Sequence, residues 1–192
     1  NGFGVTLITK SSRVLRNLDI LKSIQTHSKC VIQMTLTTYN EKLCKKLEPN
    51  VSTTKERFET LLTLQKEGIP TIVWLTPILP FINDNEENLR GILDYCIKAY
   101  VKGIICFGMG VTLREGNREF FYSKLDQHFP GLKEKYIHKY GNSYILSSPQ
   151  NKKLMRIFHQ VCEENGIMHE HEEIFNYLRT YEDHRLDLLD FI

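Results

Sequence analysis

Four short, almost uninterrupted apolar segments divide this chain, and each of them is followed by the pattern of an amphipathic helix. The segments cover residues 5–8, 30–36, 71–75 and 103–107. Strands with this apolar character are typical of parallel sheets, because helices cover both faces of such a sheet. Strands that alternate with helices indicate an α/β fold. The sequence therefore predicts a series of βα units around one parallel sheet.

The helical segments between these strands carry ordinary start signals. Ser11 or Ser12 can cap the helix that follows the first strand. Thr53 and Glu56 have the spacing of a capping box at the start of a later helix. Asp84 is expected to cap the helix after the third strand. Further helices are expected over about 40–47, from 149 to Gly166, and over about 172–180.

The length of the chain limits how much of a barrel it can form. It has 192 residues, whereas a closed (β/α)8 barrel needs ~250. The chain begins at Asn1 rather than at a methionine and enters an apolar segment almost at once. We therefore expect a fragment of a barrel whose earlier strands lie upstream.

Composition excludes several classes of protein. Formal net charge is only +2, which argues against a polyanion-binding surface over the whole chain. The five cysteines are dispersed, which is typical of reduced thiols in the cytosol rather than of a disulfide framework. No segment approaches the ~20 apolar residues of a membrane span, and no secretory signal opens the sequence. These features predict a cytoplasmic protein with no membrane partner.

Polar residues follow each predicted strand, where ligands bind in parallel βα architectures. The candidate binding residues at these strand ends are Lys10, Thr35, Thr37, Thr76, Pro77 and Arg114. Lys10 could hold a carboxylate or phosphate, serve as a Schiff-base amine, or be an ordinary surface lysine. The threonines suit a polar small molecule but are also common strand residues. Arg114 follows two glycines and could bind an anion.

Two further groups of residues have a structural and a functional interpretation. His169 and His171 resemble a metal motif, but residues two apart point to different sides of a helix and no third ligand is evident. We therefore predict no metal site and assign these histidines to the start of a helix. The aromatic residues between 120 and 140 could stack on bases. Packing of a helix on the sheet is the interpretation we prefer for them.

Several separated motifs resemble one family of enzymes. They are Thr9-Lys10-Ser11, Thr35-Leu36-Thr37-Thr38 with Leu47-Glu48-Pro49, Gly68-Ile69-Pro70, and Pro77-Ile78-Leu79-Pro80-Phe81-Ile82-Asn83-Asp84. In this order they resemble the radical S-adenosylmethionine enzymes related to spore photoproduct lyase, which are often labelled DNA repair photolyases. The resemblance extends to about Met109 and weakens after Arg114.

The resemblance implies a fold and a cofactor. The family fold is a partial (β/α)6 TIM-type barrel, so residues 1–192 would be its C-terminal part. Barrel strands three to six would lie in about 1–114, and a helical extension would cover about 115–192. Lys10 and Thr35 would hold the methionyl part of S-adenosylmethionine, with Thr37 in the same strand end. Thr76 and Pro77 would line its nucleoside side, and Arg114 would bind an anionic group.

The implied chemistry is formation of a 5′-deoxyadenosyl radical by a [4Fe–4S] cluster. Implied partners are S-adenosylmethionine, DNA or another nucleic acid, and an electron donor such as a flavodoxin or ferredoxin. The family holds its cluster with a Cys-x-x-x-Cys-x-x-Cys motif, which is absent from this sequence. Three thiolates are needed because the cofactor occupies the fourth iron site. We therefore expect no catalytic residue and no cluster in this chain, and an inactive fragment of a lyase-like enzyme.

Two alternatives remain open from the sequence. The chain could belong to a barrel enzyme without redox chemistry, in which Lys10 forms a Schiff base with a carbonyl substrate. It could also be a non-catalytic module that presents its aromatic last third to nucleic acid or to another protein. The substrate itself is not encoded in any of these patterns.

Overall fold

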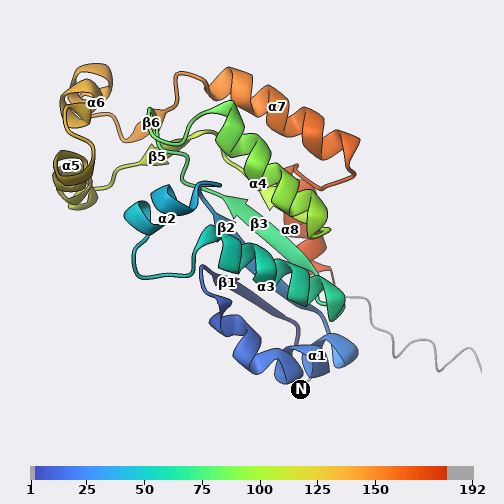
Figure 1. The fold of residues 1–192 in the computed structure, drawn as a ribbon. Helices are drawn as coiled ribbons and strands as arrows, with labels where there is room; N and C mark the ends of the chain where they lie inside the picture. The colour runs from blue at the N-terminus through green and yellow to red at the C-terminus, as the bar shows by residue number, and fades with distance from the viewer. Residues whose placement is uncertain (1–2, 181–192) are drawn as a thin grey trace, which may run out of the picture.

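The computed structural model describes residues 3–180 and contains a parallel sheet with helices on both faces (Figure 1). The sheet has the order β1-β2-β3-β4, and each neighbouring pair is parallel. Its strands are β1 (Val5–Thr9), β2 (Cys30–Leu36), β3 (Thr71–Leu75) and β4 (Gly103–Ile105). The predicted α/β class is thus confirmed, and the arrangement matches a fragment of a partial barrel.

The helices and remaining strands follow in chain order. The helices are α1 (Leu18–His27), α2 (Glu41–Leu47), α3 (Thr54–Lys66), α4 (Glu86–Lys98), α5 (Asn117–His128), α6 (Leu132–Tyr140), α7 (Asn151–Glu164) and α8 (His171–Arg179). A 3₁₀-helix (Ser12–Asn17) precedes α1, and β5 (Gly110–Thr112) pairs antiparallel with β6 (Ile145–Ser147). No helix among the described residues is both long and apolar enough to cross a membrane.

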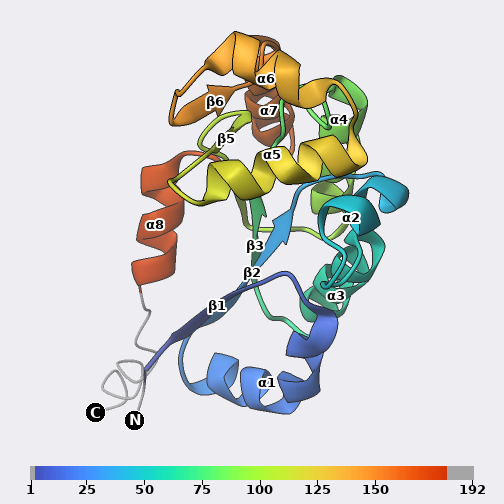
Figure 2. The same cartoon turned by 90° about the vertical axis from the view of Figure 1, so that its left-hand side faces the viewer.

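The two faces of the sheet bury different layers of side chains. On one face, Met34 and Val73 belong to the largest apolar cluster, which also takes in residues of α3, α4 and α7. On the other face, Val31 and Ile72 pack against Ile174 of α8. Figure 2 shows α8 and α3 on opposite sides of the sheet. Every residue of β2 is buried, which accounts for its continuous apolar sequence.

A small cap of β5, β6, α5 and α6 lies beyond the carboxyl ends of the sheet (Figures 1 and 2). It has an apolar core of its own, made by Leu113, Leu125, Tyr136 and Leu146. The Tyr136 hydroxyl donates a hydrogen bond to the Pro80 carbonyl oxygen at 2.5 Å, which ties the cap to the loop after β3. The cap therefore covers the carboxyl ends of the strands, where the sequence predicts a binding site.

Some local predictions need correction. Asn85, and not Asp84, caps α4, because its side chain accepts a hydrogen bond from the backbone N–H of Asn88. Asp84 is buried and accepts a hydrogen bond from the Ser148 hydroxyl instead. Strand β6 lies within the region expected to be helical. The part of that predicted extension after Thr180 lies outside the described residues.

Candidate functional site

A cavity of about 340 Å³ lies between the carboxyl ends of the first three strands and the cap. Lys10 follows β1, Thr37 follows β2, and Pro77 and Leu79 follow β3; all four line the cavity. Residues 46–49 of α2 and the loop after it complete one wall. The convergence follows from the topology, because parallel strands end at the same edge of their sheet.

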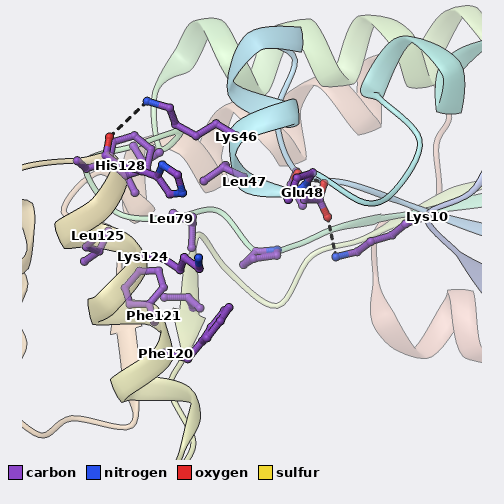
Figure 3. A pocket seen from close by; sticks show the side chains of 16 residues that line it. Lys10, Lys46, Leu47, Glu48, Leu79, Phe120, Phe121, Lys124, Leu125 and His128 are labelled. Atoms are coloured by element: carbon purple, nitrogen blue, oxygen red, sulfur yellow. Dashed lines mark hydrogen bonds and ion pairs between the residues drawn. The ribbon is translucent and has the colours of Figure 1, made fainter.

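Helix α5 supplies the opposite wall of this cavity. Figure 3 shows its side chains facing Lys10 and Glu48 across the cavity; the labelled ones are Phe120, Phe121, Lys124, Leu125 and His128. The Lys124 ammonium lies 5.6 Å from the centre of the Phe120 ring. Across the cavity, the Lys46 Nζ donates to the His128 carbonyl oxygen at 3.3 Å, which joins α2 to α5. The wall therefore combines aromatic rings with cations.

Glu48 is the most strongly held side chain of the cavity. Its carboxylate forms ion pairs with Lys10 at 2.8 Å and with Arg57 at 2.9 Å. It also accepts a hydrogen bond from the Thr37 hydroxyl at 2.9 Å. Only 11% of the Glu48 side chain is exposed, whereas 39% of Lys10 is. Lys10 therefore presents its ammonium to the cavity while Glu48 fixes its position.

Arg57 is the anchor beneath this ion pair, and its side chain is fully buried. Its Nε donates to the Ser52 carbonyl oxygen at 2.8 Å, and its Nη1 donates to the Thr35 carbonyl oxygen at 2.9 Å. The planar guanidinium thus links the loop before α3 to the end of β2 while it neutralises Glu48. Two of its three nitrogens thus donate hydrogen bonds, and the third forms the ion pair with Glu48. Such partners offset the cost of burying its charge.

Burial opposes ionisation of Glu48, but the effect of its charged and hydrogen-bonding partners on its pKa is larger. Desolvation alone would raise the pKa of this carboxyl. The contact with Lys10, the charge of Arg57 and the hydrogen bond from Thr37 act in the other direction and bring the pKa below its ordinary value of 4.5. Glu48 is therefore a carboxylate at neutral pH and acts as the counter-ion of Lys10 rather than as a proton donor.

A second cavity of about 570 Å³ adjoins the first at the ends of β3 and β4. Its lining includes Thr76, the segment 107–112, Ser147 and Asn151. Pro77 and Val111 line both cavities. The Asn151 side chain accepts a hydrogen bond from the Met109 backbone N–H at 2.7 Å, which fixes the loop after β4.

The predicted binding residues divide into two groups. Lys10, Thr37 and Pro77 line the first cavity, and Thr76 and Pro77 line the second. Thr35 lines neither cavity; it is buried in β2, and its carbonyl oxygen serves Arg57. Arg114 also lines neither, and its Nε donates to the Tyr144 hydroxyl at 3.4 Å. The roles assigned to Thr35 and Arg114 stay predictions.

Glu48, Arg57 and the α5 wall were not assigned functions from the sequence. The burial of Arg57 could have been inferred from the sequence, because Arg57 lies four residues before Leu61 and seven before Leu64 on the buried face of α3. A cation on an apolar stripe requires a buried partner. The identity of that partner, Glu48, is decided by the path of the chain between α2 and α3.

The cysteines do not form a site for an iron–sulfur cluster. All five, at positions 30, 44, 96, 106 and 162, are free, buried thiols. Burial raises the pKa of Cys106 to about 11 and that of Cys162 to about 12. A cluster needs three thiolates gathered around one centre. The group of three potential ligand residues that meets within residues 3–180 contains no cysteine. The residues of this chain do not fit a [4Fe–4S] cluster.

Comparisons with known proteins give a distant relation. No protein-family model matches the chain. The chain is 30% identical over 82 residues to the uncharacterized protein MJ0683 of Methanocaldococcus jannaschii. The aligned residues make up 43% of this chain and 30% of that protein. The fold of this chain is similar to that of spore photoproduct lyase complexed with dinucleoside spore photoproduct, with a TM-score of 0.57 and 14% sequence identity. That likeness covers 85% of this chain and 49% of the lyase chain.

These comparisons define the fold and the extent of the chain. At 14% identity, the likeness to spore photoproduct lyase is a relation of fold. The chain spans about half of the lyase chain and less than a third of the archaeal protein. The class defined by the fold is an α/β protein that matches a fragment of a partial barrel, with a cavity at its strand ends.

Proposed function

We propose that this chain is the C-terminal part of a radical S-adenosylmethionine enzyme related to spore photoproduct lyase. In this proposal it contributes residues that bind the cofactor, namely Lys10, Thr37, Thr76 and Pro77, which we call the cofactor cradle. The observation that carries the proposal is the convergence of Lys10, Thr37 and Pro77 on one strand-end cavity. Each belongs to a different motif of the family resemblance. The fold likeness to spore photoproduct lyase over 85% of the chain supports the same assignment.

The chemistry of the cavity suits S-adenosylmethionine, which combines an amino-acid carboxylate with a purine nucleoside. The Lys10 ammonium has three N–H donors, and Glu48 engages one side of it. The remaining donors can hold the carboxylate of the methionyl part. The Glu48 carboxylate, held ionised by Lys10 and Arg57, would favour the cofactor's positive sulfonium and amino groups. Thr76 and Pro77, at the junction of the two cavities, would line the nucleoside.

The division of the parent protein is part of this proposal. Residues 1–114 would carry barrel strands three to six, and residues 115–192 would form the extension. Because the cysteines here do not fit a cluster, its three ligands would come from outside residues 1–192, and no redox step is assigned to this chain. On its own the chain is expected to bind cofactor but not to turn over.

The substrate would bind between the α5 wall of the cavity and Lys46 of α2. The structure of spore photoproduct lyase is a complex with dinucleoside spore photoproduct. Phe120 and Phe121 offer ring faces for stacking, and Lys46 and Lys124 offer positive charge for phosphates. These features support a nucleic-acid substrate for the parent protein. An electron donor such as a flavodoxin or ferredoxin and a cytoplasmic location remain predictions from the sequence.

The Schiff-base hypothesis is less well supported. It needs a lysine desolvated in an apolar pocket. Lys10 instead keeps 39% of its side chain exposed and pairs with the Glu48 carboxylate at 2.8 Å. This arrangement suits a fixed cation that binds an anionic group.

Cofactor binding by the isolated chain tests the proposal. We expect calorimetric titration with S-adenosylmethionine to show one site, and Lys10→Met to weaken binding at least about tenfold, since a charge-assisted hydrogen bond contributes about 1.5–3 kcal/mol. Lys66→Met, which removes an exposed lysine at the far end of α3, is the matched control and should leave the affinity unchanged. Absence of binding by the unmodified chain, or equal binding by the Lys10 variant, would contradict the proposal.

A further inference from the structure

Three potential metal ligands meet near the segment that bridges to the beginning of β4, whereas the cavity lies at the carboxyl ends of the strands. His159 belongs to α7, and His169 and Glu170 lie in the segment between α7 and α8. One ligand atom from each residue lies within 4.8 Å of the other two. The rings of His159 and His169 are 5.1 Å apart between their centres. The sequence prediction compared His169 with His171, but His171 contacts the Cys106 carbonyl oxygen instead.

The His169 ring is held in the orientation that a metal ligand requires. Its Nδ1 lies 3.0 Å from the Ile167 carbonyl oxygen. A carbonyl oxygen can only accept a hydrogen bond, so Nδ1 carries the hydrogen and Nε2 of the neutral ring has a free lone pair. This Nε2 points toward the carboxylates of Glu163 and Glu170. Ligand histidines in metalloproteins typically have this second hydrogen bond to a backbone carbonyl.

The backbone that carries His169 is fixed to the sheet. The Met168 N–H donates to the Lys102 carbonyl oxygen at 3.1 Å, and the Ile104 N–H donates to the Met168 carbonyl oxygen at 2.8 Å. Met168 thereby forms a parallel bridge with Gly103 at the beginning of β4. A site built on such a segment is preorganised, since the sheet holds it before any ion binds.

A fourth ligand is available on α7. Glu163 lies four residues after His159, so the two side chains share one face of the helix. Its carboxylate oxygen lies 4.0 Å from the His169 Nε2, and that of Glu170 lies 3.8 Å from the same atom. Hydrogen bonds between nitrogen and oxygen span about 2.7–3.2 Å. The groups are therefore gathered without bonding one another directly, which leaves room for a cation among them.

We propose that His159, His169 and Glu170, with Glu163 as the fourth ligand, bind a zinc ion. Two imidazole nitrogens with carboxylate oxygens are a common zinc set, and harder cations prefer oxygen ligands alone. A tetrahedral zinc site with bonds of about 2.0–2.2 Å places its ligand atoms roughly 3.3–3.6 Å apart. Glu163 and Glu170 are exposed and have free rotamers, so they can close that remaining distance.

The ion would cross-link α7 and the N-terminal end of α8. It would join α7 to the residue that precedes α8, and α8 covers one face of the sheet through Ile174. Zinc binding should therefore raise the thermal midpoint of unfolding, because the ion binds the folded state and not the separated ligands. This role is independent of the proposed cofactor cradle.

Zinc and cobalt titrations of the tag-free, chelator-treated chain test the site. We expect one equivalent of Zn²⁺ to bind and to raise the melting temperature. His159→Asn and His169→Asn should each weaken Zn²⁺ binding at least about tenfold, which is the lower end of the loss seen even for outer partners of a metal. His138→Asn, which changes an exposed histidine of α6, should bind as tightly as the unmodified chain.

The same experiment separates this site from the cysteines. Co²⁺ bound by nitrogen and oxygen ligands shows visible d–d bands without the intense thiolate-to-cobalt charge-transfer absorption that cysteine ligands produce. Charge transfer of that kind, undiminished affinity in both histidine variants, or no binding of Zn²⁺ at micromolar concentration would each overturn the proposal. Circular dichroism of each metal-free variant confirms that a loss of binding does not come from unfolding.

Discussion

The strand-end cavity and the junction of α7 with α8 each gather charged side chains, but they balance the charge in different ways. In the cavity, the Glu48 side chain is 11% exposed and meets two cations at 2.8 and 2.9 Å. At the junction, Glu163 and Glu170 are exposed and stand 4.0 and 3.8 Å from a histidine nitrogen. The first set balances its charges within the protein. The second is proposed to gain its partner from a bound cation, so the two regions should respond oppositely to mutation and to metal.

The largest expected effect comes from removing the buried cation. Arg57→Met leaves the Glu48 carboxylate buried with only the partly exposed Lys10 to neutralise it, and two backbone carbonyl oxygens lose their donor. We expect the free energy of unfolding to fall by about 3–5 kcal/mol. Urea denaturation measures this loss. Arg156→Met, at an exposed position of α7, is the control and should stay within about 0.5 kcal/mol of the unmodified chain.

Glu48→Gln should lower the free energy of unfolding by about 2 kcal/mol at neutral pH, because hydrogen bonds to charged groups contribute about 1.5–3 kcal/mol. The pKa of Glu48 is lowered by folding, so its ionised form stabilises the fold above the ordinary value of 4.5. That contribution is lost as the pH falls through the lowered pKa. Unfolding measured between pH 7 and pH 3 should show the two proteins converging in acid, and a constant difference would contradict this account.

Lys10→Met should change stability little while changing ligand binding strongly. The pair with Glu48 is partly exposed, so water screens it and we expect a loss of about 0–1 kcal/mol. The same substitution is expected to weaken S-adenosylmethionine binding at least about tenfold. A stability loss as large as that of Arg57→Met would mean that Lys10 is mainly structural, and would weaken the proposed cradle.

The smallest expected effect is at the junction in the absence of metal. His159→Asn in the presence of a chelator should lower the free energy of unfolding by about 0.5 kcal/mol, because the side chain loses only partly exposed ring contacts with Phe158 and His169. With Zn²⁺ added, the unmodified chain should become more stable than the variant. Equal melting temperatures with and without Zn²⁺ for both proteins would remove the contrast between the two regions.

The elements and part of the cavity could be predicted from sequence because they depend on neighbours along the chain. Apolar runs, caps and glycines fix where strands and helices begin and end, and parallel strands place Lys10, Thr37 and Pro77 at one edge. Asp84 was assigned to a cap it does not make, since Ser148, 64 residues away, competes for its side chain. Such competition is not visible in a local pattern.

The sequence by itself determined a parallel βα fold, the order of its four parallel strands along the chain and the strand ends that line the cavity. Only the tertiary structure decided which charges meet there. Glu48 and Arg57 are paired because α2 and α3 pack beside the end of β2, and His159 meets His169 because the chain reverses after α7 and joins β4. Electrostatic and coordination energies depend on distance in space, whereas sequence patterns record only distance along the chain.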